Sequence, residues 1–193
     1  MIARTLHRLV AQLRRFRSES RAAAIVEFAL VVPVLLILYM GTIEVSDLIA
    51  VDRRVNVISG TMGDLVSRAD GCVSASTMTD YFKASEGIIV PYKKTPLKQV
   101  VTFLNVNAST GVATVGWSQA YNGGTAKTVN SVYALPTAMV DISKGKWVVV
   151  AETFYAYKPM LGWVVTAAIN LHRVSYYVPR EGASISYTSG TCA

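Results

Sequence analysis

Charged residues are scarce in this chain of 193 residues: Asp, Glu, Lys and Arg make up 16% of it, whereas hydrophobic residues make up 52%. Soluble domains carry roughly 25% charged residues, and disordered chains combine high net charge with low hydrophobicity. The composition therefore excludes a disordered chain. The length allows one ordinary domain with a tail, or a small domain joined to a membrane segment.

Cysteine and histidine are also rare, with two of each. Two cysteines exclude a disulfide-dense scaffold and a paired zinc motif. The chain contains no G-x-S-x-G, P-loop, dinucleotide-binding or H-E-x-x-H motif. His172 lies in an expected strand, and the carboxylates Asp141 and Glu152 are isolated in the sequence. We therefore expect no enzyme, no metal site and no cofactor.

The basic residues are concentrated before a long apolar run. Residues 1–21 contain six arginines and one acidic residue, and Ala22–Ile43 contains one charge, Glu27. As a helix this run is about 33 Å long, enough to cross a hydrocarbon core of about 30 Å. The positive-inside rule places the basic stretch in the cytoplasm. Because that stretch abuts the span and lacks interleaved aromatics apart from Phe16, we expect no nucleic-acid partner.

The residues after the apolar run, Gly41–Ser46, fit the cleavage site of a secretory signal poorly. We therefore expect the span to remain in the mature protein. The predicted organisation is a basic cytoplasmic leader (1–22), a transmembrane segment (23–43), an amphipathic extension of the same helix (44–70) and an exported α+β domain (71–193).

Glu27 is unusual because a carboxylate inside a membrane span costs a few kcal/mol and often has a function. One interpretation is that its side chain reaches back to the cytoplasmic headgroups. The other depends on spacing. A cut between Ala22 and Ala23 would create an amine four residues before Glu27, on the same helix face. The two charges could then neutralise each other, within one subunit or between neighbours.

An apolar seam continues the helix beyond the membrane, with spacings alternating between three and four residues. Its members are Leu48, Val51, Val55, Ile58, Met62 and Leu65. The seam packs either on the protein's own sheet or on other helices in a bundle. We expect the helix to end at residues 69–71, where Gly71 suits a C-terminal cap.

The remaining sequence predicts a helix at 76–87, capped by Ser76 or Thr77, and about four antiparallel strands. The expected strands are 100–106, 112–119, 147–157 and 169–178, and the segment 129–142 could hold a helix broken at Pro136. The fold class is α+β, with the long N-terminal helix packed on a small antiparallel sheet. We expect the tail from Arg180 to be looser.

Cys72 and Cys192 both follow the span, so both lie in the oxidising compartment of the predicted topology. A disulfide would tie the end of the chain to the base of the long helix. The alternative is two unpaired thiols.

The segment Arg21–Leu36 resembles the N-terminal signature of TadE/TadG-like proteins, the minor pilins or pseudopilins of Tad-type (type IVb) pili. The step Gly41–Glu44 is also similar, and 148–161 with 169–173 resembles that family's C-terminal strands more weakly. The middle of the chain, 70–145, carries no matching motif.

The resemblance implies that a prepilin peptidase cuts between Ala22 and Ala23, which makes Glu27 the fifth residue and leaves Phe28 beside it in the assembly region. The family usually has Gly where this chain has Ala22. The implied function is structural: a minor pilin or pseudopilin that takes part in assembly of a Tad pilus for surface attachment. The implied partners are the peptidase, other pilin subunits and the Tad secretion machinery.

The implied location is the bacterial inner membrane, crossed once, with the N-terminus cytoplasmic and the C-terminal domain periplasmic or carried into an extracellular pilus. An uncleaved, membrane-anchored exported binding domain outside any fibre is the alternative function.

Overall fold

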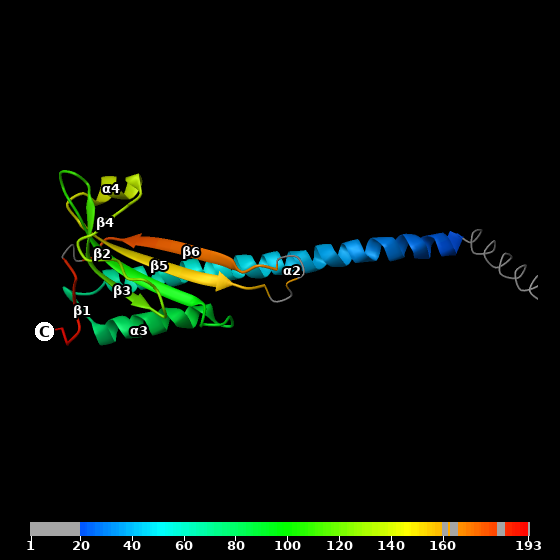
Figure 1. Ribbon diagram of the computed structural model, residues 1–193, viewed down its shortest axis with the longest axis horizontal. Helices are drawn as coiled ribbons and strands as arrows, with labels where there is room; N and C mark the ends of the chain where they lie inside the picture. The colour runs from blue at the N-terminus through cyan, green and yellow to red at the C-terminus, as the bar shows by residue number, and fades with distance from the viewer. Residues whose placement is uncertain (1–19, 160–161, 163–165, 181–183, 193) are drawn as a thin grey trace, which may run out of the picture.

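A long helix projects far beyond a domain that is packed around its second half (Figure 1). The computed structural model describes residues 20–159, 162, 166–180 and 184–192. The predicted α+β class, with a long N-terminal helix on an antiparallel sheet, is confirmed. Residues 1–19, most of the expected basic leader, lie outside the described residues.

The long helix, α2, spans Ser20–Ser67 and passes through Pro33 without ending. It ends slightly before the predicted 69–71. The reason is a tightened last turn, in which the amides of Arg68 and Ala69 donate to carbonyls three residues back, at Leu65 and Val66. Gly71, with φ +66°, then turns the chain away from the helix axis.

The main sheet has the strand order β4-β3-β2-β5-β6, and each neighbouring pair is antiparallel. The strands are β2 (Leu97–Val106), β3 (Ala113–Tyr121), β4 (Val132–Tyr133), β5 (Trp147–Tyr157) and β6 (Ile169–Tyr177). All four predicted strands are present. The prediction of about four strands is one too few, because β4 is a two-residue strand formed only by pairing with β3 at Ala113 and Thr114.

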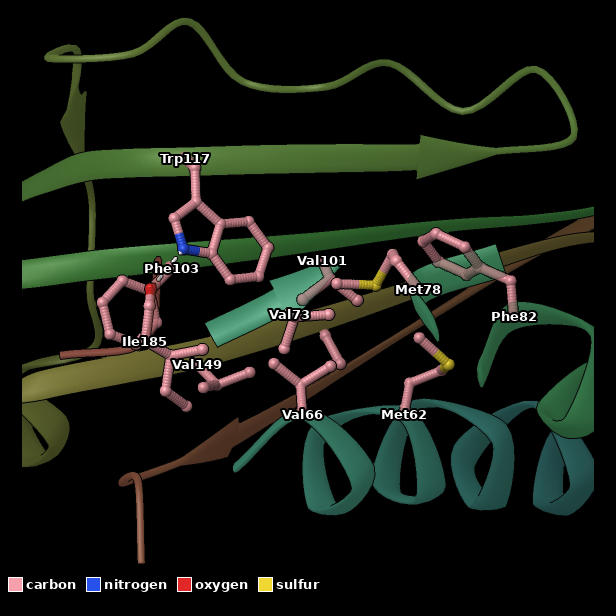
Figure 2. Close-up of a cluster of buried hydrophobic side chains, with 11 residues drawn as sticks. Met62, Val66, Val73, Met78, Phe82, Val101, Phe103, Trp117, Val149 and Ile185 are labelled. Atoms are coloured by element: carbon pink, nitrogen blue, oxygen red, sulfur yellow. Dashed lines mark hydrogen bonds between the residues drawn. The ribbon is translucent and has the colours of Figure 1, made fainter. Parts of the chain in front are cut away.

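Alternation along β5 gives the sheet two apolar faces. Val149, Ala151, Tyr155 and Tyr157 face the clusters that include the second half of α2. Val148 and Val150 belong to a separate cluster on the opposite face. Figure 2 shows the first of these clusters, in which Met62 and Val66 from α2 meet Phe103 and Trp117 from the sheet. The helix is therefore held along one face of the sheet, chiefly on β5 and β6.

Two shorter helices lie in the domain. Helix α3 (Ala75–Glu86) begins one residue before the predicted start, and its N-cap is Ser74 rather than Ser76 or Thr77. Ser74 is extended because it ends strand β1 (Cys72–Ser74), so its hydroxyl is free to accept from the amide of Thr77 at 3.2 Å. A single 3₁₀ turn, η1 (Gly87–Ile89), follows α3. Helix α4 (Thr137–Ser143) starts directly after Pro136.

The expectation of a loose tail is wrong for its last part. Strand β7 (Ser186–Thr188) pairs in parallel with β1, and Ile185 is buried in the core. The indole Nε1 of Trp117 donates to the carbonyl of Ile185 at 2.6 Å. The sequence could not reveal this because both strands are only three residues long.

Candidate membrane-anchoring and assembly site

The first half of α2 lies outside the core of the domain. None of its side chains from Ala23 to Ile43 is buried, and large apolar residues such as Ile25, Phe28 and Leu30 are about 70% exposed. Within Ala23–Ser67 the helix is long and apolar enough to cross a membrane. In water this surface would be very unfavourable, so it needs a bilayer or other apolar helices around it.

The residues of the predicted processing site lie in the first turns of the described helix. Ala22 is part of the helical backbone, and Ala23, Glu27 and Phe28 are all exposed. Glu27 lies one turn after Ala23, on the same face. No hydrogen bond or ion pair links the Glu27 carboxylate to another residue in the described ranges, so the fold itself does not neutralise it.

The second half of α2 packs on the protein's own domain. Val51, Val55, Ile58 and Met62 are almost completely buried, and Leu48 packs at the edge of the same clusters. Leu65 is only half-buried, and Val66 is buried in its place. A straight α-helix drifts about 20° per heptad from a strict seven-residue repeat, which moves the seam from position 65 to 66.

Three acidic residues, spaced along the second half of α2, form hydrogen bonds or ion pairs with the domain. Asp47 accepts hydrogen bonds from the hydroxyls of Tyr92 (2.5 Å) and Tyr157 (2.6 Å). Further toward the C-terminal end of the helix, Asp52 forms an ion pair with Arg173 at 2.6 Å. Asp64 pairs with Arg180 at 2.8 Å and also with Arg68. These interactions fix the rotation of the helix about its axis and its position along the sheet.

The tyrosines around Asp47 are held in their neutral form. The hydrogen bond to Asp47, followed by burial, raises the pKa of Tyr92 to about 12. Burial, followed by the bond to Asp47, raises the pKa of Tyr157 as well. At neutral pH both phenols therefore remain donors to the carboxylate. Nothing in the sequence alone indicated that Tyr92 and Tyr157, 65 residues apart, would meet at Asp47.

A disulfide joins Cys72 to Cys192 across 120 residues, with the two Cα atoms 5.8 Å apart. It lies at the end of the domain that is remote from the apolar half of α2, beside the pairing of β1 with β7. The bond ties the end of the chain to the segment that follows α2.

A second polar cluster lies on the outer face of the sheet, and sequence reasoning missed it. Glu152 is 5% exposed, with Lys127 Nζ at 3.3 Å and His172 Nε2 at 3.4 Å from its oxygens. The ring of His172 stacks on Phe154. In the parts of the chain that the structure describes, no group of three His, Cys, Asp or Glu could hold a metal ion.

Comparison with known proteins agrees with the geometry of the helix. The family model described as TadE-like protein matches residues 22–57, from the predicted processing site to the middle of the packed half of α2. Residues 22–57 are therefore TadE-like. The N-terminal resemblance is thereby confirmed, and it associates the chain with Tad pili and with membrane anchoring through one helix. Searches of curated proteins and of solved structures gave no significant match.

Proposed function

We propose that this TadE-like protein is a minor pilin or pseudopilin, a structural subunit that takes part in assembling a Tad-type pilus for surface attachment. A prepilin peptidase would cut between Ala22 and Ala23, and α2 would hold the subunit in the inner membrane until assembly. The exported domain would stand in the periplasm, and other pilin subunits and the Tad secretion machinery would be its partners.

The observation that carries the proposal is the division of α2 into two halves. The domain buries one face of its second half, whereas no apolar side chain of its first half is buried and nearly all are exposed. Exposed Val45, Ile49 and Val57 add apolar side chains to the outward face of the packed half, where Arg53 lies between Ile49 and Val57. A helix that moves from a bilayer into a bundle of similar helices requires such a surface, because both environments are apolar.

Glu27 supports assembly rather than anchoring alone. A helix that served only as an anchor would gain a few kcal/mol of insertion free energy from an apolar residue at this position. The carboxylate has no partner among the described residues, so its counter-charge would come from another source. After cleavage, the amine of Ala23 in the same or a neighbouring subunit would supply it.

The test is replacement of Glu27 by Leu and by Gln in cells that assemble the pilus. Because removal of one partner from a buried charge pair costs about 3–5 kcal/mol, we expect pilus formation and surface attachment to fall by more than a hundredfold. Thr42→Val is a matched control, since the Thr42 hydroxyl is already bonded to the carbonyl of Leu38 in the same helix. Normal attachment by Glu27→Leu at a normal protein level would refute the pairing.

The mature N-terminus separates this function from its alternative, an uncleaved anchored domain outside any fibre. One feature of the sequence favours the alternative: Ala22 occupies the position before the cut where similar proteins usually have Gly. We expect mass spectrometry of the membrane fraction to find a chain that starts at Ala23, and Ala22→Gly to accelerate its appearance. A chain that retains residues 1–22 would favour the uncleaved anchor.

A further inference from the structure

The proposed anchoring places the end of the exported domain that faces the exposed half of α2 at the membrane surface. Strand β5 and helix α3 both end here, and the connection from η1 to β2 also lies at this end (Figure 1). Asp47 follows the last residue of the predicted span, Ile43, by four residues. That is about 6 Å along a helix, and a bilayer's headgroup layer is about 5–7 Å thick on each side. The residues around Asp47 therefore lie among the headgroups.

A groove of about 760 Å³ opens at this level beside Asp47. Its wall combines Tyr92, Tyr155 and Tyr157 with the prolines at 91, 96 and 159. Lys93 and Lys158 stand at the groove and are exposed. Aromatic rings with a polar end and lysines with long apolar stems are the side chains that suit the boundary between water and lipid.

Two lysines, Lys93 and Lys158, and one carboxylate, Asp47, line the groove. Both oxygens of Asp47 already accept hydrogen bonds from tyrosines. The hydroxyl of Tyr155 is also engaged, since it donates to the backbone carbonyl of Lys93 at 3.0 Å. Nearby, Lys94 lies 3.4 Å from the carboxylate of Glu86. Lys93 and Lys158, in contrast, have no ion-pair partner in the described part of the chain. The lining therefore carries a net positive charge, because its two lysines outnumber the carboxylate of Asp47.

We propose that this groove binds the phosphate of an anionic phospholipid in the outer face of the membrane that α2 crosses, with Lys93 and Lys158 as the groups that contact the phosphate. The tyrosine and proline wall would pack against the glycerol and the upper part of the acyl chains. The inference rests on the proposed membrane anchoring. It adds a second attachment that holds the domain against the bilayer in one orientation until the subunit is withdrawn into the fibre.

The test uses the full chain in a zwitterionic detergent, titrated with soluble dihexanoyl phosphatidylglycerol and followed by thermophoresis. Each lysine near an anionic surface contributes about a fivefold gain in binding, so the double variant Lys93→Gln/Lys158→Gln is expected to bind about 25-fold more weakly. The matched control is Lys144→Gln/Lys146→Gln, which removes two exposed lysines at the opposite end of the domain. This control is expected to bind as tightly as the unchanged chain.

Two further titrations distinguish the source of the phosphate. Dihexanoyl phosphatidylcholine is expected to bind weakly, and inorganic phosphate is expected to bind at least tenfold more weakly than the phospholipid because it makes no contact with the tyrosine wall. Equal binding of inorganic phosphate and phosphatidylglycerol would overturn the lipid assignment. Equal binding by the two double variants would overturn the site itself.

Failure of the anchoring proposal would be visible separately. Carbonate extraction of cell membranes reports whether α2 is embedded, and neither double variant changes the apolar half of the helix. A chain released by carbonate would refute the anchor whatever the titration gives. A chain retained by the membrane, with no loss of lipid binding in Lys93→Gln/Lys158→Gln, would refute only the lipid site.

Discussion

Gly63 of α2 lies directly against the ring of Tyr177 on β6, and it provides a sharp test of the packing. A Cβ atom built on Gly63 would lie 2.3 Å and 2.6 Å from two ring carbons of Tyr177 on β6. Gly60, one turn earlier, faces the same side chain, but its Cβ would lie 3.5 Å from the Tyr177 hydroxyl oxygen, an ordinary contact. Gly63→Ala therefore forces a displacement that Gly60→Ala does not.

The size of the effect follows from comparing the two variants. Both glycines lie inside α2, so each substitution gains up to about 1 kcal/mol from helix propensity, and this gain cancels in the comparison. Carbon atoms prefer to be about 3.5–4.0 Å apart, so the Tyr177 ring must retreat by more than about 1 Å in Gly63→Ala. Overpacking of this kind costs about 1–3 kcal/mol. We expect Gly63→Ala to be less stable than Gly60→Ala by that amount.

The assay is guanidinium denaturation of the full chain in detergent, followed by tryptophan fluorescence, because Trp117 and Trp147 both pack in the cluster above Tyr177. The double variant Gly63→Ala/Tyr177→Ala completes the cycle. Once the ring is absent, the Gly63 substitution should become neutral or stabilising. The packing described here would be wrong if Gly63→Ala matched Gly60→Ala, or if the penalty persisted without the ring.

Two other predictions concern the disulfide and the alkaline limit of stability. Cys72→Ser/Cys192→Ser should lower the free energy of unfolding by up to about 4–5 kcal/mol, because the disulfide closes a loop of 120 residues. Amide hydrogen exchange in the variant should accelerate first in β1 and β7, which pair beside the disulfide. Slow exchange in these two strands would contradict this prediction. For Tyr92, the pKa is raised from 10.0 to about 12 in the folded state, so its contribution to stability is complete below pH 10 and is lost as the pH rises through 12. Between these values Tyr92→Phe should show a shallower fall of unfolding free energy with pH than the unchanged chain, and parallel curves would exclude this role.

Local patterns in the sequence were sufficient for the elements that have strong local signals. The β5 strand was predicted with its observed bounds because its two faces are both apolar and alternate in side-chain type, and the hairpin at 107–111 followed from its turn residues. The elements that were missed depend on distant partners. Strands β1, β4 and β7 have two or three residues each. Strands β1 and β7 form only because they pair with each other across the length of the domain sequence, and β4 forms only because it pairs with two residues of β3.

The candidate site divides in the same way. The apolar half of α2 and the exposed Glu27 could be read from hydropathy and charge, because a membrane span is a local property of the sequence. The binding of Asp47 by two tyrosines and the cluster around Glu152 could not, since each joins side chains from three separate segments. The groove beside Asp47 belongs to this second class.

Glu27 differs from the other acidic residues of α2 because the domain does not engage it. There are five, and the domain engages the four in the second half of the helix: Glu44 is buried, and Asp47, Asp52 and Asp64 accept bonds from domain side chains. Asp47→Ala should therefore lower the unfolding free energy by about 1–3 kcal/mol, because two phenols lose their acceptor. Glu27→Ala should leave that free energy unchanged while pilus assembly is lost. If Glu27→Ala destabilised the isolated protein as Asp47→Ala does, the partner of Glu27 would lie in its own folded domain, and pairing with the Ala23 amine would be refuted.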